Sequence, residues 1–338
     1  QPFAEIMCGI AGIWGSTLNA AEAEQRVASM LDAQKHRGPD GRGQLSFPGG
    51  AAGMVRLALV DLSPRGQQPL WSPDRTVAIV FNGEMYNHAS ERQRLDGFPF
   101  QSTSDTEVVL ALYLKHGLSF VDRLRGMYAI AIFDFRDRGP DAPPTLVLAR
   151  DPFGIKQLYL HQQGTTVAFA SELRALRASR LFDFAVDPEG LYDFLHYGFV
   201  LQPRTIQRAV RQLPPGTLWV GSPNGAREQR FWSLPGPTRR AGSFEEGARE
   251  LRAVLEDSVR LHALADAPVG AFLSGGIDSS GVVALMARHV RQLHTYTLRM
   301  SSDPGDEAQP AAEFARTLGC DHTEVDVRQL DLPALVPS

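Results

Sequence analysis

The chain has 338 residues, which is long for one domain and favours two. Its hydrophobic fraction of 43% is ordinary for a globular protein, and its net charge of -4 without a basic block argues against a nucleic-acid partner. No apolar run is long enough to span a bilayer, so no membrane partner is expected. With only two cysteines, Cys8 and Cys320, we expect no disulfide framework and a cytoplasmic location.

Near the start of the chain, Met7 is followed directly by a Cys-Gly-Ile-Ala-Gly run over residues 8–12. A small residue behind a methionine permits methionine removal, and Cys8 would then carry a thiol and a free α-amine. Such a residue holds a nucleophile together with its own general base. A cysteine in this position can also be a small buried hydrophobic residue. Residues 1–6 form no recognisable signal peptide, and this chemistry requires that they and Met7 be removed.

Up to about residue 234 the pattern predicts mostly strands, with a helix pair near the start. One helix is expected over 22–35, with one side formed by Ala23, Val27, Met30, Leu31 and Gln34. Ser104 and Glu107 predict a capping box that opens another helix, which Gly117 closes. Strands are expected at 76–81, 127–135, 145–150, 158–161 and 166–171. Strands and helices in separate groups favour a layered α and β structure.

Residues 235–242 are rich in Pro, Gly and Arg and predict a linker. Ser243 and Glu246 form a second predicted capping box, which opens a helix. The rest alternates, with strands expected at 269–273, 293–300 and 323–327 and helices at 280–290 and 307–318. This order predicts the beginning of a doubly wound parallel sheet. Since such a sheet usually has more than three strands, we expect the natural protein to be longer.

Three segments of the first half carry polar groups suited to a free amino acid. Arg56 sits in an otherwise apolar strand that is expected over 56–61, and its guanidinium could grip an α-carboxylate or lie on the surface of an edge strand. Asn82-Gly83 predicts a turn, but the Asn amide and the next N–H could also form an oxyanion hole. Glu84 and Asp105 could hold an ammonium group, although Asp105 could simply favour a helix N-terminus. With the Cys8 thiol, this set describes a pocket in which a side-chain carbonyl is attacked.

The chain resembles the class II glutamine amidotransferases, and specifically the asparagine synthetase family. The matching segments are Cys8–Gly12, Arg37–Gly41, Asn82–Glu84, Ser104-Asp105 and Arg150–Gly154. The resemblance implies a four-layer αββα N-terminal-nucleophile (Ntn) hydrolase domain over residues 8–234. It also implies that residues 243–338 are the N-terminal part of a doubly wound ATP-pyrophosphatase domain.

The resemblance further implies that the first domain is a glutaminase. Cys8 would attack the carboxamide of L-glutamine while its own α-amine moves the proton. Asn82 and Gly83 would form the oxyanion hole. The groups that would bind the rest of glutamine are Arg56, Glu84, Asp105 and the backbone of Leu59 and Val60. The segment 37–41 is a turn by composition, and in the family it belongs to a loop that closes near glutamine.

In the second half, the run 272–280 follows a predicted strand and opens a helix, an arrangement in which backbone N–H groups can cradle an anion. The lysine of an ordinary P-loop is absent, and the Ser-Gly-Gly-x-Asp-Ser pattern resembles the pyrophosphate loop of N-type ATP pyrophosphatases. The resemblance implies that ATP is bound by Phe272, Ser274, Gly275, Gly276, Asp278, Ser279, Ser280 and Leu298. In that set Asp278 would ligate Mg²⁺. Asp306-Glu307 resembles an acidic pair of the family, although a plain helix N-terminus accounts for it too.

The resulting hypothesis is a glutamine-dependent, ATP-dependent amidotransferase. Ammonia would pass to an adenylated carboxylate, with L-aspartate as the default acceptor and AMP and pyrophosphate as products. A homodimer is also expected. A second Ser-Gly-Glu-Gly-x-Asp-Glu loop and a catalytic lysine of the family do not occur before Ser338. Alternatives are another carboxylate acceptor, a glutaminase that feeds a different acceptor domain, and a glutamine- or nucleotide-binding protein without synthetase activity.

Overall fold

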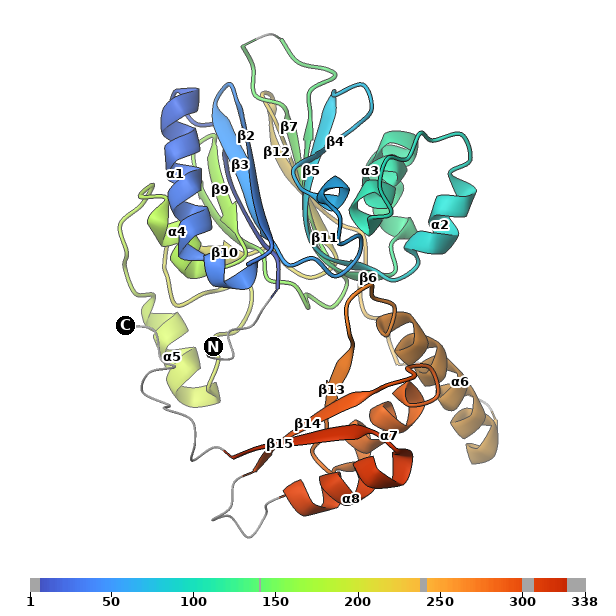
Figure 1. Ribbon diagram of the computed structural model, residues 1–338. Coiled ribbons are helices and arrows are strands. Elements are labelled where there is room, and N and C mark those ends of the chain that lie inside the picture. The colour runs from blue at the N-terminus through green and yellow to red at the C-terminus, as the bar shows by residue number, and fades with distance from the viewer. Residues whose placement is uncertain (1–6, 140, 238–241, 300–306, 327–338) are drawn as a thin grey trace. The chain divides into compact units, whose positions relative to one another are not determined.

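The computed structural model describes residues 7–139, 141–237, 242–299 and 307–326 (Figure 1). These residues divide into two compact units, the first ending at Pro235 and the second beginning at Gly236. This division falls inside the stretch that the sequence predicts as a linker, of which residues 238–241 lie outside the described part.

The first unit is built on two antiparallel sheets of six strands each. The strands of one sheet, in spatial order, are β10 (Arg211–Gln212), β8 (Tyr159–Gln163), β9 (Thr166–Ala170), β1 (Gly9–Trp14), β3 (Gly50–Arg56) and β2 (Gly41–Phe47). Those of the other are β12 (Gly225–Arg230), β11 (Thr217–Ser222), β7 (Thr145–Arg150), β6 (Gly126–Asp134), β5 (Val77–Met85) and β4 (Leu70–Trp71). The two sheets face each other across a core of large apolar side chains that includes Met54, Phe133 and Trp219.

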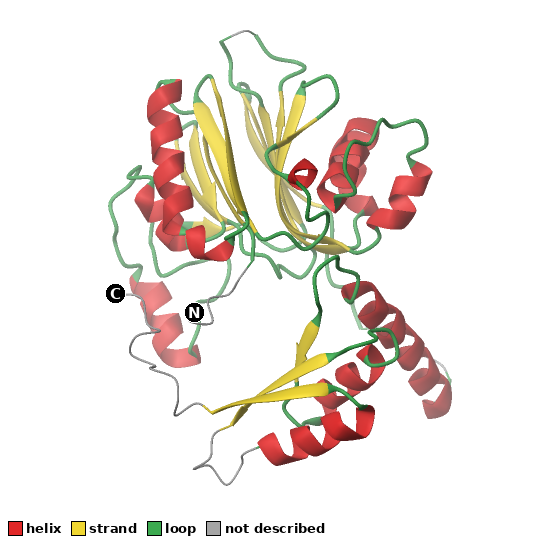
Figure 2. Cartoon of the chain, viewed as in Figure 1, coloured by secondary structure: helices red, strands yellow, loops and turns green. Residues whose placement is uncertain are grey.

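Helices cover the outer faces of both sheets, so the unit has four layers in the order αββα (Figures 1 and 2). Helices α1 (Ala20–Ala33) and α4 (Leu173–Ala178) pack on the sheet that contains β1. Helix α3 (Asp105–His116) packs on the sheet that contains β5, and α2 (His88–Arg94) packs against α3. The remaining helical segments are α5 (Pro188–Tyr197) and the 3₁₀ turns η1 (Lys35–Arg37), η2 (Pro64–Gly66) and η3 (Gly117–Arg123). The predicted αββα architecture is confirmed.

The first helix illustrates how sequence pattern becomes packing. The Asn19 side chain accepts the Glu22 N–H and caps α1, which therefore starts two residues before the predicted helix. All five side chains that the 3.6-residue period places on one side are fully buried: Ala23, Val27, Met30, Leu31 and Gln34. The amphipathic pattern is therefore confirmed.

Three local predictions in this unit are wrong. Asn82 and Gly83 make no turn, because β5 continues through them to Met85 while paired with β6. The strand expected over 56–61 does not form, because Arg56 ends β3 and a loop follows it. Ser104 does cap α3, but the Glu107 carboxylate accepts the N–H groups of residues 101 and 102, so the reciprocal half of the capping box is not formed.

The second unit contains three parallel strands, β13 (Gly270–Phe272), β14 (His294–Arg299) and β15 (Asp321–Asp326), joined through α7 (Ile277–Met286) and α8 (Ala308–Leu318). The predicted capping box of Ser243 and Glu246 opens α6 (Phe244–His262), with both of its hydrogen bonds present. Helix α7 begins three residues earlier than the predicted Ser280, because the chain already turns into the helix at Gly276. The predicted strands also include Met300 and Val327, which lie outside the described residues.

In the described part of the chain, no helix combines the length and the apolar character that a bilayer crossing needs. Cys8 and Cys320 are both free thiols.

Candidate active site

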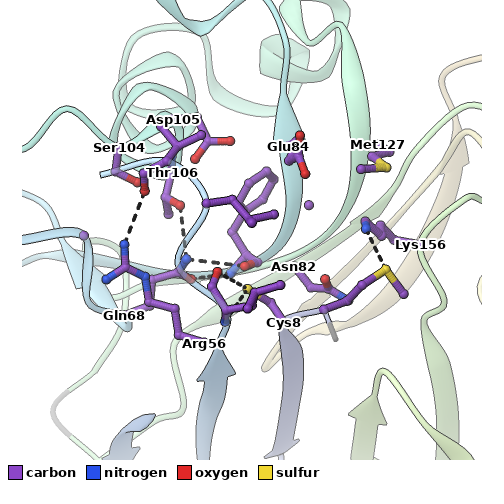
Figure 3. A pocket seen from close by; sticks show the side chains of 17 residues that line it. Cys8, Arg56, Gln68, Asn82, Glu84, Ser104, Asp105, Thr106, Met127 and Lys156 are labelled. Atoms are coloured by element: carbon purple, nitrogen blue, oxygen red, sulfur yellow. Dashed lines mark hydrogen bonds between the residues drawn. The ribbon is translucent and has the colours of Figure 1, made fainter. Parts of the chain in front are cut away.

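A cavity of about 230 Å³ lies in the first unit where Cys8, β3, β5 and the start of α3 meet (Figure 3). All eight residues that the sequence analysis assigns to the glutamine site line this cavity: Cys8, Arg56, Leu59, Val60, Asn82, Gly83, Glu84 and Asp105. They come from four separate segments of the chain, so the fold gathers them into one place.

Cys8 directly precedes β1 and presents its thiol to the end of β3. Its Sγ donates to the Leu57 carbonyl oxygen over 3.4 Å and accepts the Leu57 N–H over 3.3 Å. Burial raises the pKa of the thiol, while the hydrogen bond from Leu57 and the positive charges of Lys156 and Arg56 act in the opposite direction. The sulfur is therefore held in place by backbone groups, beside cations that favour its thiolate form.

Arg56 is buried at the end of β3, and its guanidinium organises the loop that follows. It donates to the carbonyl oxygens of Val60, Asp61 and Ser63. Gly66 lies so close that a Cβ there would be 2.3 Å from Nη2. The positive charge is thus fixed at the cavity wall, where it could pair with an anionic group.

Asn82 and Gly83 lie at a free edge of β5, beyond the short strand β4. The Phe81 N–H donates to Gln68 Oε1 over 2.6 Å and the Met85 N–H donates to Asp105 Oδ2 over 2.9 Å, both away from β6. Because alternate residues of a strand direct their N–H groups to the same edge, the Gly83 N–H also points away from β6. Gly83 must be a glycine because a Cβ would lie 2.2 Å from the Met127 carbonyl oxygen.

The Asn82 side chain reaches across to the other sheet. It is 1% exposed, and its Nδ2 donates to Ser171 Oγ over 3.3 Å. The same hydroxyl accepts the Ile10 N–H over 3.0 Å, so one serine joins Asn82 to the strand that follows Cys8. This shared contact fixes the amide relative to the thiol.

Asp105, the first residue of α3, supplies a buried carboxylate. Burial raises its pKa, and the hydrogen bond from the Met85 N–H and the charge of His88 act against that rise. A cationic group that entered the cavity would stabilise the ionised form of this carboxylate. Glu84 lines the same cavity from β5, so two carboxylates are available there.

In the second unit, the segment between β13 and α7 forms a tight loop with Gly275 at a φ of +74°. Ser279 Oγ accepts the Ser274 N–H over 3.2 Å and lies 2.9 Å from Ser274 Oγ, which closes the loop on the first turn of the helix. Gly276 caps α7 without a side-chain hydrogen bond. The N–H groups of that first turn are therefore available to an anion.

Other predicted nucleotide residues surround this loop. Phe272 ends β13 and Leu298 lies in the neighbouring strand β14, and both side chains are exposed. Asp278 is in the first turn of α7, and Ser280 lies in the same helix. Glu307 directly precedes α8, while its sequence neighbour Asp306 lies outside the described residues.

Comparison with known families decides what kind of protein carries these two sites. Residues 7–232 match the glutamine amidotransferase domain family. The chain belongs to the glutamine amidotransferase family. Residues 250–338 match the asparagine synthase family, so the chain is an asparagine synthetase-like class II amidotransferase.

Curated relatives of this amidotransferase carry several names. Asparagine synthetase [glutamine-hydrolyzing] 1 of Bacillus subtilis is 33% identical over 94% of this chain and 49% of its own length. An amidase of Penicillium rubens, chyE, is 34% identical over 93% of this chain and 50% of its own length. Asparagine synthetase [glutamine-hydrolyzing] 2 of Arabidopsis thaliana is 32% identical over 94% and 50% of the two chains. The chain spans about half the length of the curated relatives it matches.

Solved structures support the fold of the amidotransferase. Glutamine phosphoribosylpyrophosphate amidotransferase of B. subtilis aligns with a TM-score of 0.50 at 20% identity, over 94% of this chain and 65% of the other. An allosteric regulatory enzyme of purine biosynthesis aligns with a TM-score of 0.51 at 18% identity, over 94% and 80% of the two chains. At these identities the likeness concerns the fold alone, and it agrees with the Ntn-hydrolase layers described above.

Several cavity residues of the amidotransferase were missed by sequence reasoning. The most consequential is Lys156, which lines the cavity beside Cys8 although its chain neighbours form a loop after β7. It lies two residues beyond the segment 150–154 that the sequence analysis singled out, but no local pattern there links it to Cys8. Gln68, which holds the Phe81 N–H, was missed because a lone glutamine gives no local signal.

The segment 37–41 supports the site from outside the cavity. Arg37 Nε donates to the Cys8 carbonyl oxygen over 2.9 Å, and Asp40 Oδ2 accepts the Ala58 N–H over 2.9 Å. The segment therefore ties Cys8 to the loop after β3, although none of its residues is among those that line the cavity.

Proposed function

We propose that the first unit is a glutaminase that uses Cys8 as an N-terminal nucleophile. The observation that carries this proposal is the meeting of a thiol, a fixed guanidinium and two carboxylates in one cavity. A free amino acid carries one carboxylate and one ammonium group, which these charges complement. We assign the glutaminase domain to residues 8–234.

In the proposed reaction, the Cys8 sulfur bonds to the side-chain carbonyl carbon of glutamine as the C–N bond breaks. The thiol proton moves to the Cys8 α-amine and from there to the leaving nitrogen, which departs as ammonia. Water then cleaves the thioester, releases glutamate and restores the thiol. Arg56 would bind the α-carboxylate with help from the backbone of Leu59 and Val60, while Glu84 and Asp105 would bind the α-ammonium.

The proposed oxyanion hole is the Gly83 N–H together with the Asn82 amide. A primary amide nitrogen has two hydrogens, so donation to Ser171 leaves one for the oxyanion. Such donors stabilise the charge that develops on the carbonyl oxygen.

The direct test is to incubate a chain that begins at Cys8 with L-glutamine and to measure glutamate and ammonia. L-Asparagine serves as the control substrate, because its shorter side chain cannot reach Cys8 while its charged groups are held. Absence of glutamate release at millimolar glutamine would contradict the proposal.

Replacing Asn82 with alanine is expected to lower kcat by about 10²–10³ through loss of one oxyanion donor. KM should change much less, since the charged groups that bind the ends of glutamine remain. Asn224→Ala, in the turn between β11 and β12, is the matched control and should keep wild-type kinetics. A wild-type kcat for Asn82→Ala would remove this residue from the oxyanion hole.

We further propose that residues 243–338 are the N-terminal part of a synthetase domain that binds ATP. Phe272, Gly275, Gly276 and the serines of the 274–280 segment would hold adenine and pyrophosphate. Asp278 would hold Mg²⁺ together with phosphate oxygens, since Mg²⁺ usually binds one or two carboxylates plus substrate phosphates.

The proposed overall reaction transfers ammonia to an adenylated carboxylate and releases AMP and pyrophosphate. L-Aspartate is the first acceptor to test, with asparagine formation as the measurement, because relatives named asparagine synthetase match along both units. The amidase relative makes other carboxylates the second set to test. We also propose that the protein is a homodimer and is cytoplasmic. Light scattering of the purified protein tests whether it is a dimer.

Asp278→Asn is expected to weaken Mg²⁺-dependent ATP binding about tenfold, or about 1.4 kcal/mol, because a charged ligand of the metal is lost. Calorimetry with and without Mg²⁺ measures this effect. Asp257→Asn on α6 is the control, and glutamine hydrolysis should be unchanged in both variants. Equal loss of glutaminase activity would contradict the assignment of the two reactions to separate units.

A further inference from the structure

The loop after β7 is built around two fully buried charged residues. Arg150 donates to the carbonyl oxygens of Gly154, Lys156 and Leu213 over 2.7–2.8 Å. The Asp151 carboxylate accepts the N–H groups of Phe153, Ile155 and Lys156 over 3.0 Å each. Both side chains thus hold the backbone of Lys156, and these hydrogen bonds offset the cost of burying the two charges.

The Lys156 side chain extends from this loop into the cavity that contains Cys8 (Figure 3). It is only 5% exposed, and its Nζ donates to Met7 Sδ over 3.1 Å. Lysine is rarely buried, and a thioether is a weak acceptor for an ammonium group. Met7 is joined to the Cys8 nitrogen by a peptide bond, so the ammonium lies against the residue that must leave to free the Cys8 amine.

We propose that Lys156 is a positioning residue for the nucleophile, whose positive charge disfavours protonation of both the α-amine and the thiol of Cys8 once Met7 is removed. The inference rests on the proposed glutaminase function and deepens it. An α-amine must be unprotonated to accept the thiol proton, and a nearby cation makes a second positive charge unfavourable. The low polarity of a buried site strengthens this repulsion.

Other charges also face the Cys8 region, and they come from each element around it: Arg37, Arg56, Glu84, Asp105, Asp151 and Glu172. Arg37 donates to the Cys8 carbonyl and pairs with Glu172, while Arg56 donates only to neutral carbonyl groups of the loop after β3 and so keeps its positive charge. Burial lowers the pKa of Lys156, while Glu84 and Cys8 act to raise it. Glu84 therefore favours the charged form of Lys156, and Lys156 still lies beside Cys8.

The first test compares glutamine hydrolysis across pH for chains that begin at Cys8. The variants are wild type, Lys156→Met, Lys156→Gln and Lys156→Arg. In the two neutral variants the acidic limb of the kcat/KM profile should move to higher pH. On that limb kcat/KM should fall about tenfold for each pH unit of displacement. At higher pH, on the plateau, kcat/KM should return to the wild-type value. Lys156→Arg should keep the wild-type limb. A loss by one constant factor at every pH would indicate a merely structural role and overturn the proposal.

The second test needs no turnover and so separates this inference from the glutaminase proposal. Iodoacetamide alkylation of Cys8 is followed against pH by peptide mass spectrometry, with Cys320 in the other unit as the internal control. The neutral Lys156 variants should require higher pH for half-maximal alkylation of Cys8 and show no change at Cys320. An unchanged Cys8 profile in folded variants overturns the inference, even if the wild type hydrolyses glutamine. If the wild type releases no glutamate, the glutaminase proposal fails while this measurement still decides the role of Lys156.

Discussion

Replacing Cys8 with alanine is expected to abolish glutamine hydrolysis, with a loss of at least about 10³-fold. The sulfur is the atom that bonds to the substrate carbonyl in the proposed reaction, and no other thiol lies among the residues that line the cavity. Release of glutamate over time, with saturating L-glutamine, measures the effect.

The matched control is Cys320→Ala, which removes the other cysteine of the chain from the second unit. It should hydrolyse glutamine like the wild type. Cys8→Ala should still bind glutamine in calorimetry, because Arg56 and Asp105 remain to pair with the charged ends of the ligand. Hydrolysis that survives in Cys8→Ala but is lost in Cys320→Ala would place the nucleophile elsewhere.

Much of the cavity could be predicted from the sequence because its chemistry sits in short contiguous segments. A local sequence pattern indicates a chemical role for each of Cys8, Arg56 and Asp105, and all three line the same cavity. The αββα layers could be predicted for a similar reason, since the family resemblance spans the segments that form both sheets.

Other features depend on contacts between residues far apart in the chain. Asn82-Gly83 has the local preferences of a turn, but pairing with β6 along nine residues keeps the strand extended.

The position of Lys156 shows the same limit most clearly. Its loop is anchored by Arg150, which also donates to Gln202 and Gln212 from distant parts of the chain. No window of sequence around residue 156 contains those partners. Its place beside Cys8 therefore follows from the folded structure and not from a local pattern.

Retention of Met7 is expected to reduce glutamine hydrolysis by about 10²–10⁴-fold relative to a chain that begins at Cys8. With Met7 present, the Cys8 nitrogen is part of an amide, which cannot accept the thiol proton. An α-amine has a pKa near 8, so a useful fraction of it is unprotonated at neutral pH. Met7 also lines the cavity and accepts a hydrogen bond from Lys156 there.

The experiment starts from a chain that begins at Met7 and treats it with methionine aminopeptidase. Glutaminase activity should appear in proportion to the fraction of chains that have lost one methionine, as measured by mass spectrometry. A Cys8→Ala chain processed in the same way is the control and should gain nothing. Full hydrolysis by chains whose mass still includes Met7 would mean that another group takes the proton, and the N-terminal-nucleophile mechanism would have to be abandoned.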